Sequence, residues 1–327
     1  MEIIRAGEIM ASHPEHERLP HDPAYEIGSA YIVDHFCPIT EAAIPIVDCG
    51  FMHADAVYDV VSVSRGSFFR LEQHQARFAR ACAAIRVSNP FDREREAEIL
   101  HELVARTGLR DAYVWWTVTR GQPPLGRSEM VDATKFVNCF YGFVVPFIFI
   151  ADDTQRTRGV DLIVSRDRVR ISPRAVDPTA KNFCWLDMQM ALFEAGDRGA
   201  EWAVLTDEAG FLAEAAGANV FAVVDGVVVT PDAGCLEGIT RQSVFDLCGE
   251  LGLPVKCTRL HADELRSAQE VFMTTTAGSV MPVRSVDGAL VGGRDGPGEA
   301  STRLHNLYWE KRWSGWDATP VRYELSG

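Results

Sequence analysis

Apolar residues alternate in two series of short segments along this chain, one before Pro146 and one after it. In the first series the predicted strands are residues 43–48, 58–63, 67–71 and 113–119, and the predicted helices are residues 71–86 and 93–107. In the second, the predicted strands are residues 160–165, 202–206, 220–224, 227–230 and 271–275, and the predicted helices are residues 183–195 and 240–251. Asp225-Gly226 predicts a hairpin between two of these strands. The pattern indicates two mixed α/β domains.

The domain boundaries follow from the same pattern. We expect an N-terminal arm and a small α+β domain over residues 1–145, a linker over residues 146–152 and a large α/β domain over residues 153–327. The first forty or so residues are polar and contain several prolines, so they are predicted to be an extended arm. The apolar segment 137–151 contains Asn138 and Pro146 and is too short to cross a bilayer, which favours a buried strand that leads into the linker.

Charge and cysteine content narrow the class of protein. The net charge of −14 argues against a nucleic-acid partner, because binding to a phosphate backbone needs a basic surface. We expect no membrane partner either. The eight cysteines form no C-x-x-C pair and no signal peptide is recognisable, so a reducing cytoplasm is expected. The histidines at positions 13, 16 and 21 lack a cysteine partner, and we expect no metal site.

Lysine is scarce, and one lysine has an unusual setting. Only four of the 32 basic residues are lysines, namely Lys135, Lys181, Lys256 and Lys311. A lysine at the start of a helix is most often solvated. Lys181, however, follows a short turn-forming segment, and Glu214 lies at a strand end downstream. A lysine amine can hold an aldehyde cofactor covalently and can also transfer a proton, so Lys181 is the candidate catalytic residue.

Further elements accompany Lys181 in a fixed order. They are His74-Gln75-Ala76-Arg77 upstream, Asp177-Pro178-Thr179-Ala180-Lys181-Asn182, the run from Leu212 to Phe221 that contains Glu214, Gly238-Ile239-Thr240-Arg241 and Thr274-Thr275-Thr276-Ala277-Gly278. In this order and spacing, from about residue 50 to about residue 282, the chain resembles the class IV aminotransferases. These are fold type IV enzymes that depend on pyridoxal 5'-phosphate, and they include the branched-chain and D-amino acid aminotransferases.

The resemblance implies roles for the matching residues. Lys181 would bind the cofactor, and Glu214 would keep its pyridine nitrogen protonated so that the ring accepts electrons. The remaining cofactor residues would be Arg77, Ile239, Thr240, Thr275 and Thr276, with Ile239 and Thr240 at a helix start that favours a phosphate dianion. Taken alone, Arg77 is equally typical of a solvated helix face, and Thr240 of a helix cap.

The substrate pocket differs from the branched-chain pattern. Tyr58-Asp59-Val60 stands where branched-chain enzymes usually have Phe-Glu-Gly, and Trp115-Trp116 lies where they have an arginine. In these features the chain is similar to the (R)-selective amine transaminases, which also carry His and Tyr at the places of His53 and Tyr58. The resemblance implies a pocket formed by residues His53, Tyr58, Val60, Ser62, Trp115, Arg127 and Ala277.

The predicted function is therefore transfer of an amino group from an amine donor, an (R)-chiral primary amine, to a keto acid such as pyruvate. A D-amino acid or branched-chain specificity is the first alternative. A lyase acting on aminodeoxychorismate shares the fold and the lysine, and a cofactor-binding protein without activity is the third alternative. Members of the family are dimers with active sites at the border of the second subunit, so the resemblance also implies a homodimer.

Overall fold

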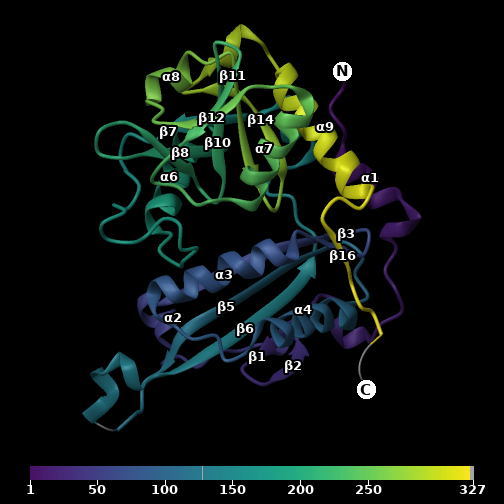
Figure 1. Ribbon diagram of the computed structural model, residues 1–327, viewed down its shortest axis with the longest axis vertical. Helices are drawn as coiled ribbons and strands as arrows, with labels where there is room; N and C mark the ends of the chain where they lie inside the picture. Colours follow the sequence, from purple (N-terminus) through teal and green to yellow (C-terminus); the bar gives the residue numbers. More distant parts are fainter. Residues whose placement is uncertain (127, 325–327) are drawn as a thin grey trace. The chain divides into compact units, whose positions relative to one another are not determined.

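The computed structural model describes residues 1–126 and 128–324, which form two compact units, each with its own sheet and core (Figure 1). The N-terminal unit comprises residues 10–148, residues 180–183 and the chain from Gly315 onward. The C-terminal unit comprises residues 1–9, 149–179 and 184–314. The change of unit after Ile148 lies inside the predicted linker, whereas the two chain ends and the segment with Lys181 belong to units that a contiguous division does not give them.

The N-terminal unit is built on a seven-stranded sheet in which every neighbouring pair is antiparallel. The order is β16 (Ala318–Pro320), β4 (Ser67–Phe69), β3 (Ala56–Ser64), β5 (Ala112–Gln122), β6 (Val137–Pro146), β1 (Ser29–Ile32) and β2 (His35–Pro38). The helices at this unit are α2 (Cys49–His53), α3 (Leu71–Ile85) and α4 (Arg93–Thr107), and α1 (Ala6–Ser12) precedes them. The predicted helices at 71–86 and 93–107 are confirmed.

Strand β3 separates the two faces of this sheet. Val57, Val61 and Val63 are buried in one core with Phe78 of α3 and Leu100 of α4. Successive residues of a strand point to opposite faces, so the even-numbered residues of β3 lie on the face away from these helices. That second face carries the predicted substrate residues.

Two expectations for the first fifty residues are wrong. The region 29–38 is not an extended arm, because β1 and β2 pair as a hairpin and β1 pairs with β6. Residues 43–48 form no strand; Ile44 and Ile46 are exposed and Pro45 interrupts the segment. Asp48 instead begins α2, where its buried carboxylate accepts hydrogen bonds from Gly50 N, the Thr119 hydroxyl and the Tyr141 hydroxyl at 2.7, 2.9 and 2.8 Å.

The C-terminal unit has a nine-stranded mixed sheet among its described residues. The order is β12 (Val255–Thr258), β11 (Val227–Pro231), β10 (Asn219–Val224), β13 (Glu270–Thr275), β14 (Ser279–Val286), β7 (Val160–Val164), β8 (Trp202–Thr206) and β9 (Leu212–Ala215), and β15 (Ala289–Leu290) pairs with β14. Its helices are α5 (Asp153–Arg158), α6 (Leu186–Asp197), α7 (Ile239–Leu251), α8 (Ala262–Arg266) and α9 (Glu299–Trp313). The predicted hairpin is confirmed, with Asp225 and Gly226 both at positive φ.

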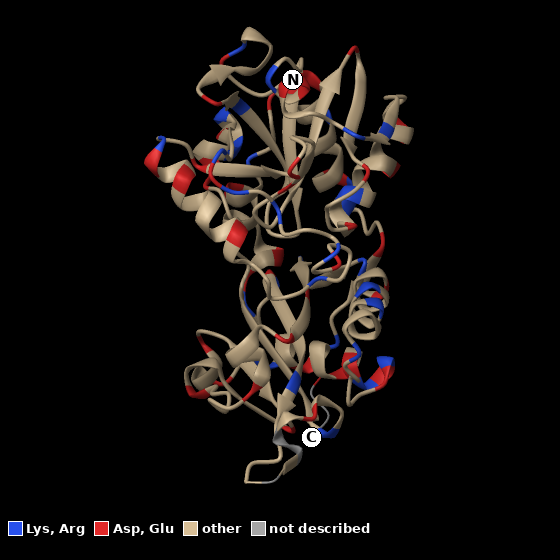
Figure 2. Cartoon of the chain, turned by 90° about the vertical axis from the view of Figure 1, so that its left-hand side faces the viewer, with Lys and Arg blue, Asp and Glu red and all other residues tan. Residues whose placement is uncertain are grey.

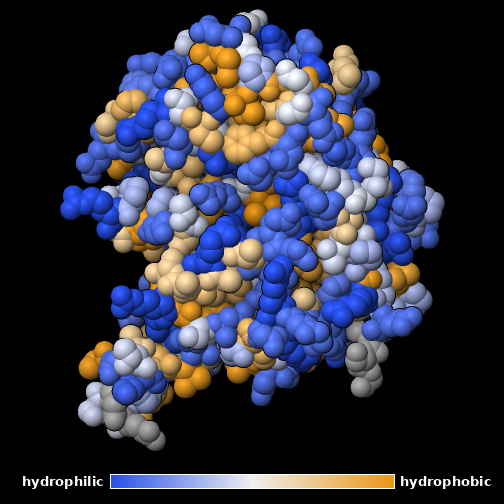
Figure 3. Space-filling model, in the orientation of Figure 1, coloured by the Kyte–Doolittle hydropathy of each residue, from blue (hydrophilic) through white to orange (hydrophobic). Residues whose placement is uncertain are grey.

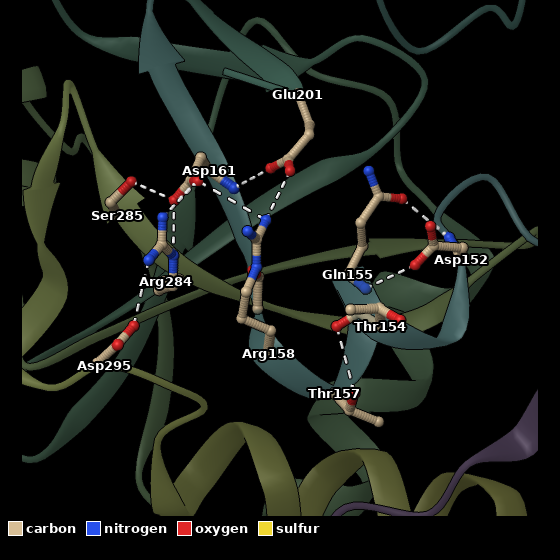
Figure 4. A network of polar contacts seen from close by, with 11 residues as sticks. Asp152, Thr154, Gln155, Thr157, Arg158, Asp161, Glu201, Arg284, Ser285 and Asp295 are labelled. Atoms are coloured by element: carbon tan, nitrogen blue, oxygen red, sulfur yellow. Dashed lines mark hydrogen bonds and ion pairs between the residues drawn. The ribbon is translucent and has the colours of Figure 1, made fainter. Parts of the chain in front are cut away.

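An ion-pair network joins two parallel strands of this sheet, β7 and β14 (Figure 4). Asp161 accepts from Nε and Nη2 of Arg284 at 3.0 and 2.7 Å, and Arg158 donates to Glu201 at 2.6 Å. These side chains remain partly exposed, so each pair stabilises the unit only modestly.

Basic and acidic residues are interspersed along the chain in the side view (Figure 2), and apolar residues lie among hydrophilic ones on the face of the space-filling view (Figure 3). Of the helices that the structure describes, none has the length and apolar character needed to span a membrane.

Candidate active site

Lys181 lies in a short segment that runs along β3 of the N-terminal unit. The backbone carbonyl of Lys181 accepts a hydrogen bond from Tyr58 N at 3.0 Å, and Asn182 forms an antiparallel bridge with Val57. Its ammonium nitrogen lies 4.3 Å from the centre of the Tyr58 ring, a favourable cation–π contact. Helix α6 begins at Leu186 and not at the predicted residue 183, because residues 180–183 pack against β3.

Arg77 takes part in a buried cluster on the helix-covered face of the same sheet. Its Nε and Nη2 donate to the two carboxylate oxygens of Asp59 at 2.8 and 2.7 Å, and His74 Nδ1 lies 2.7 Å from Asp59 Oδ1. All three side chains are buried. Burial acts to raise the pKa of Asp59, but the charges of Arg77 and His74 and their hydrogen bonds outweigh it and hold that pKa well below its usual range. The cluster therefore holds an ionised carboxylate against a fixed guanidinium.

Aromatic rings surround Lys181 on the opposite face of the sheet. Trp115 stacks on Phe143 with ring centres 5.1 Å apart, and Phe183 lies 5.9 Å from Trp115 and 5.5 Å from Tyr58. Tyr113 contacts Phe143 at 6.5 Å. We refer to Tyr58, Tyr113, Trp115, Phe143 and Phe183 as the aromatic face. Apart from Tyr58, these rings are only partly buried, which leaves part of each ring accessible to a ligand.

The other predicted pocket residues have different settings. Val60 and Ser62 lie on the same face as the aromatic rings, opposite Trp115 and Tyr113 in the pairing of β3 with β5. His53 ends α2 and is exposed. Arg127 lies outside the residues that the structure describes.

Glu214 lies on β9 of the C-terminal unit, where both of its carboxylate oxygens are engaged. Arg170 Nε donates to Oε1 at 3.0 Å, and the backbone N–H of Leu236 donates to Oε2 at 3.1 Å. Arg170 also donates to Asp187 at 2.7 Å, so one buried guanidinium joins two acids. Burial acts to lower the pKa of Arg170, but Glu214 and Asp187 outweigh it and raise that pKa. The arginine thus fixes the Glu214 carboxylate in position.

The segment held by Glu214 leads directly into α7. Asn219 Nδ2 donates to the carbonyl of Leu236 at 2.8 Å, and a Cβ at Gly238 would overlap the Asn219 side-chain oxygen. Gly238 caps α7 without any side-chain hydrogen bond, and the next two residues are Ile239 and Thr240. In the described part of the chain, the N–H groups of these two residues have no hydrogen-bond partner. Unpaired N–H groups at a helix start form an anion-binding site.

The remaining predicted residues lie at the turn between β13 and β14. Thr275 and Thr276 are partly exposed, and Ala277 is buried. The N–H of Ala277 lies 3.5 Å from the Thr275 hydroxyl, and its carbonyl accepts from Ile150 N at 2.9 Å. Threonine hydroxyls therefore lie at a turn whose backbone is held in place.

The sequence-based prediction missed several residues that complete these groups. Asp59 and His74 fall inside the quoted motifs, but the pairing of Asp59 with Arg77 spans 18 positions and could not be inferred from local patterns. Arg170 pairs with Glu214 across 44 positions, and no local signal points to it. Phe143 could have been found from the two-residue period of its strand.

Comparison with known proteins agrees with these groups. The family model described as amino-transferase class IV matches residues 56–286. The chain is 28% identical to a putative branched-chain-amino-acid aminotransferase of Methanocaldococcus jannaschii, over 86% of this chain and 96% of that one. It is 31% identical to a D-alanine aminotransferase of Bacillus licheniformis, over 79% of this chain and 88% of that one.

A solved structure gives the same result. It is a branched-chain amino acid aminotransferase of Thermus type, abbreviated T.th., with pyridoxamine 5'-phosphate, and it superimposes with a TM-score of 0.83 at 28% identity. The superposition covers 90% of this chain and 99% of that one. The likeness thus extends over both units and not over a single domain.

Proposed function

Because the chain belongs to the class IV aminotransferases, pyridoxal 5'-phosphate enzymes of fold type IV, we propose that it transfers an amino group from an (R)-chiral primary amine to a keto acid such as pyruvate. The observation that carries this proposal is the aromatic face around Lys181. The handedness of the donor rests on the resemblance of the Tyr58-Asp59-Val60 strand and His53 to the (R)-selective enzymes.

The aromatic face supports a donor without a carboxylate. A carboxylate is bound best by a basic side chain, most often an arginine. On β5 the residues that share this face are Tyr113, Trp115 and Thr117, and the next basic residue is Arg120. Arg120 is already bound to both oxygens of Asp55 at 3.0 Å. Partly accessible rings favour an aryl or alkyl group instead.

The C-terminal unit fits the phosphate group of the cofactor. The N–H groups of Ile239 and Thr240, unpaired within the described chain, and the missing Cβ of Gly238 leave an anion-binding turn at the start of α7. In this proposal Ile239, Thr240, Thr275 and Thr276 bind the phosphate, and Arg77 adds a charged donor. When bound, the cofactor supplies an aldehyde that takes up the amino group and a protonated ring that withdraws electrons.

The other residues then have distinct tasks. Lys181 holds the cofactor covalently and, once released, moves a proton at the amine-bearing carbon of the donor through Nζ. Glu214 keeps the pyridine nitrogen protonated, and Arg170 holds Glu214 in position. The substrate is lined by His53, Tyr58, Val60, Ser62, Trp115, Arg127 and Ala277.

The donor preference can be tested without an acceptor. The purified protein, saturated with pyridoxal 5'-phosphate, is mixed with (R)-1-phenylethylamine, its (S) enantiomer, D-alanine or L-leucine, and the decay of the cofactor's visible absorbance band is followed. We expect the (R)-amine to react fastest. Trp115→Ala should slow this reaction more than the reaction with isopropylamine, which has no ring. Faster reaction with D-alanine or L-leucine would refute the proposed donor while keeping the transaminase assignment.

A second candidate function is an amino acid aminotransferase. It is favoured by the relatives, which are named D-alanine and branched-chain-amino-acid aminotransferases. The same spectra decide between the two functions. Release of pyruvate from aminodeoxychorismate without any keto-acid acceptor would indicate the lyase activity instead.

We also propose that the enzyme is a cytoplasmic homodimer. Phe51 and Met52 of α2 and the nearby Ile44 and Ile46 are exposed apolar residues, an arrangement typical of an interaction surface. Eight free cysteines, six of them buried, support a reducing compartment. Sedimentation equilibrium should give twice the chain mass for the wild type and a smaller mass for Phe51→Asp, and a monomeric wild type would contradict the dimer.

A further inference from the structure

The hairpin of β13 and β14 contains two buried hydroxyl groups with no hydrogen-bond partner among the residues that the structure describes. They belong to Thr274, which is 2% exposed, and Ser279, which is 1% exposed. Burying a hydroxyl without a partner is unfavourable, and such groups are uncommon in native proteins. An unpaired hydroxyl close to a proposed ligand site can be explained by a partner that the ligand supplies.

The pairing of the strands shows which face each hydroxyl lies on. Thr274 lies opposite Asn219 of β10, and Ser279 lies opposite Thr275. Directly opposed residues share a face, and successive residues such as Thr274 and Thr275 point to opposite faces. Thr274 is therefore on the face of Asn219, and Ser279 is on the other face.

The face of Asn219 is also the face of the start of α7. The Asn219 side chain bonds to the carbonyl of Leu236 and lies against Gly238, the residue that caps α7. Directly after it come the N–H groups of Ile239 and Thr240, which no described residue pairs. An unpaired buried hydroxyl and an uncapped helix of 13 residues thus lie on one face of the described sheet.

We propose that the hydroxyl of Thr274 donates a hydrogen bond to the phosphate of pyridoxal 5'-phosphate, beside the N–H groups of Ile239 and Thr240. This inference rests on the phosphate-binding role proposed above for Ile239 and Thr240. It gives the buried hydroxyl a partner in the holoenzyme. A hydrogen bond to a charged group is stronger than one between neutral groups, so its loss should weaken phosphate binding by about tenfold or more.

The test compares binding of pyridoxal 5'-phosphate and of pyridoxal, which lacks the phosphate, to the apoprotein by absorbance titration. Thr274→Val keeps the shape of the side chain and removes the hydroxyl. We expect it to weaken binding of the phosphorylated form by about tenfold or more, to leave pyridoxal binding unchanged and not to lower the melting temperature of the apoprotein. Thr274→Ser should bind like the wild type. Ser279→Ala, which removes the hydroxyl on the other face, should also bind like the wild type.

Other outcomes would overturn the inference. Unchanged affinity in Thr274→Val, or an equal loss for the two ligands, would mean that Thr274 does not contact the phosphate. If Thr274→Val does not fold, Thr274→Ala provides the same comparison. Thr240→Val separates the two levels of the proposal: a selective loss in Thr240→Val alone refutes only the role of Thr274, and no loss in either variant refutes the proposed phosphate site as well.

Discussion

Each unit contains a buried carboxylate bound to a buried arginine, but the two pairs are arranged in opposite ways. In the N-terminal unit Asp59 is fully buried and binds Arg77 and His74. In the C-terminal unit Arg170 binds Glu214 and Asp187. In the proposed mechanism the arginine acts on the cofactor in the first pair, and the carboxylate acts on it in the second. The partner in each pair serves to fix the acting group.

An ion pair alone therefore does not reveal which of its members is functional, and the surroundings decide. Asp59 has no exposed surface and its pair lies on the helix-covered face of the sheet, so its task is to hold Arg77. Glu214 also binds Leu236 N, which leads into the anion-binding turn of α7, so it lies among groups with proposed ligand contacts. A buried charge needs its partner in both cases, and this requirement gives the first prediction.

Asp59→Asn should have the largest effect on stability. Arg77 would stay buried without its counter-charge, and breaking such a pair costs about 3–5 kcal/mol of the free energy of unfolding. Urea denaturation measures this loss. Asp55→Asn is the control, because Asp55 also binds an arginine with two hydrogen bonds but is partly exposed, and its loss should cost about 1 kcal/mol or less. Equal losses in the two variants would contradict the special role of the Asp59 pair.

Glu214→Gln should lower turnover by about 10²–10³-fold while the cofactor still binds, because a neutral amide does not keep the pyridine nitrogen protonated. Steady-state kinetics and cofactor titration measure both quantities. The matched control is Asp187→Asn, which removes the other acid bound by Arg170 and leaves Glu214 in place. A similar loss of turnover in the control would show that the intact network matters, and not the Glu214 carboxylate itself.

Glu96 offers the smallest and most graded test, because it is a buried carboxylate that accepts a hydrogen bond from the neutral side chain of Asn89. Burial raises its pKa to about 7, against a lowering contribution from Gln75 and Asn89. Since the folded pKa is raised, the stabilising contribution of protonated Glu96 is complete below about pH 4.5 and is lost as the pH rises through about 7.

Glu96→Gln should remove this dependence. Relative to the variant, the wild type should lose about 1–3 kcal/mol between about pH 5 and pH 8, measured by urea denaturation at each pH. The same pair of measurements on Asp59→Asn should show no such loss in this range, because the pKa of Asp59 lies far below it. A stability difference between wild type and Glu96→Gln that does not change with pH would contradict the raised pKa.

Local sequence predicted what depends on neighbouring residues. The helices α3, α4 and α7 and the Asp225-Gly226 hairpin follow from periodicity and turn preference, and Lys181, Ile239 and Thr240 follow from contiguous motifs. The strand predicted at residues 43–48 failed because alternation alone does not supply a neighbouring strand. The partners Asp59 and Arg170 could not be predicted, since a pairing over 18 or 44 positions is set by the fold. The same holds for Thr274, whose face is defined only by its pairing with Asn219.

Lys181 is proposed to carry the cofactor, and one measurement tests this role directly. The holoenzyme is reduced with sodium borohydride, which fixes the bound cofactor to its lysine, and the digested protein is mapped by mass spectrometry. With only four lysines in the chain, the assignment is unambiguous. We predict a phosphopyridoxyl group on Lys181 alone, and none in Lys181→Ala. The same group on Lys135, Lys256 or Lys311 in place of Lys181 would show that a different lysine holds the cofactor.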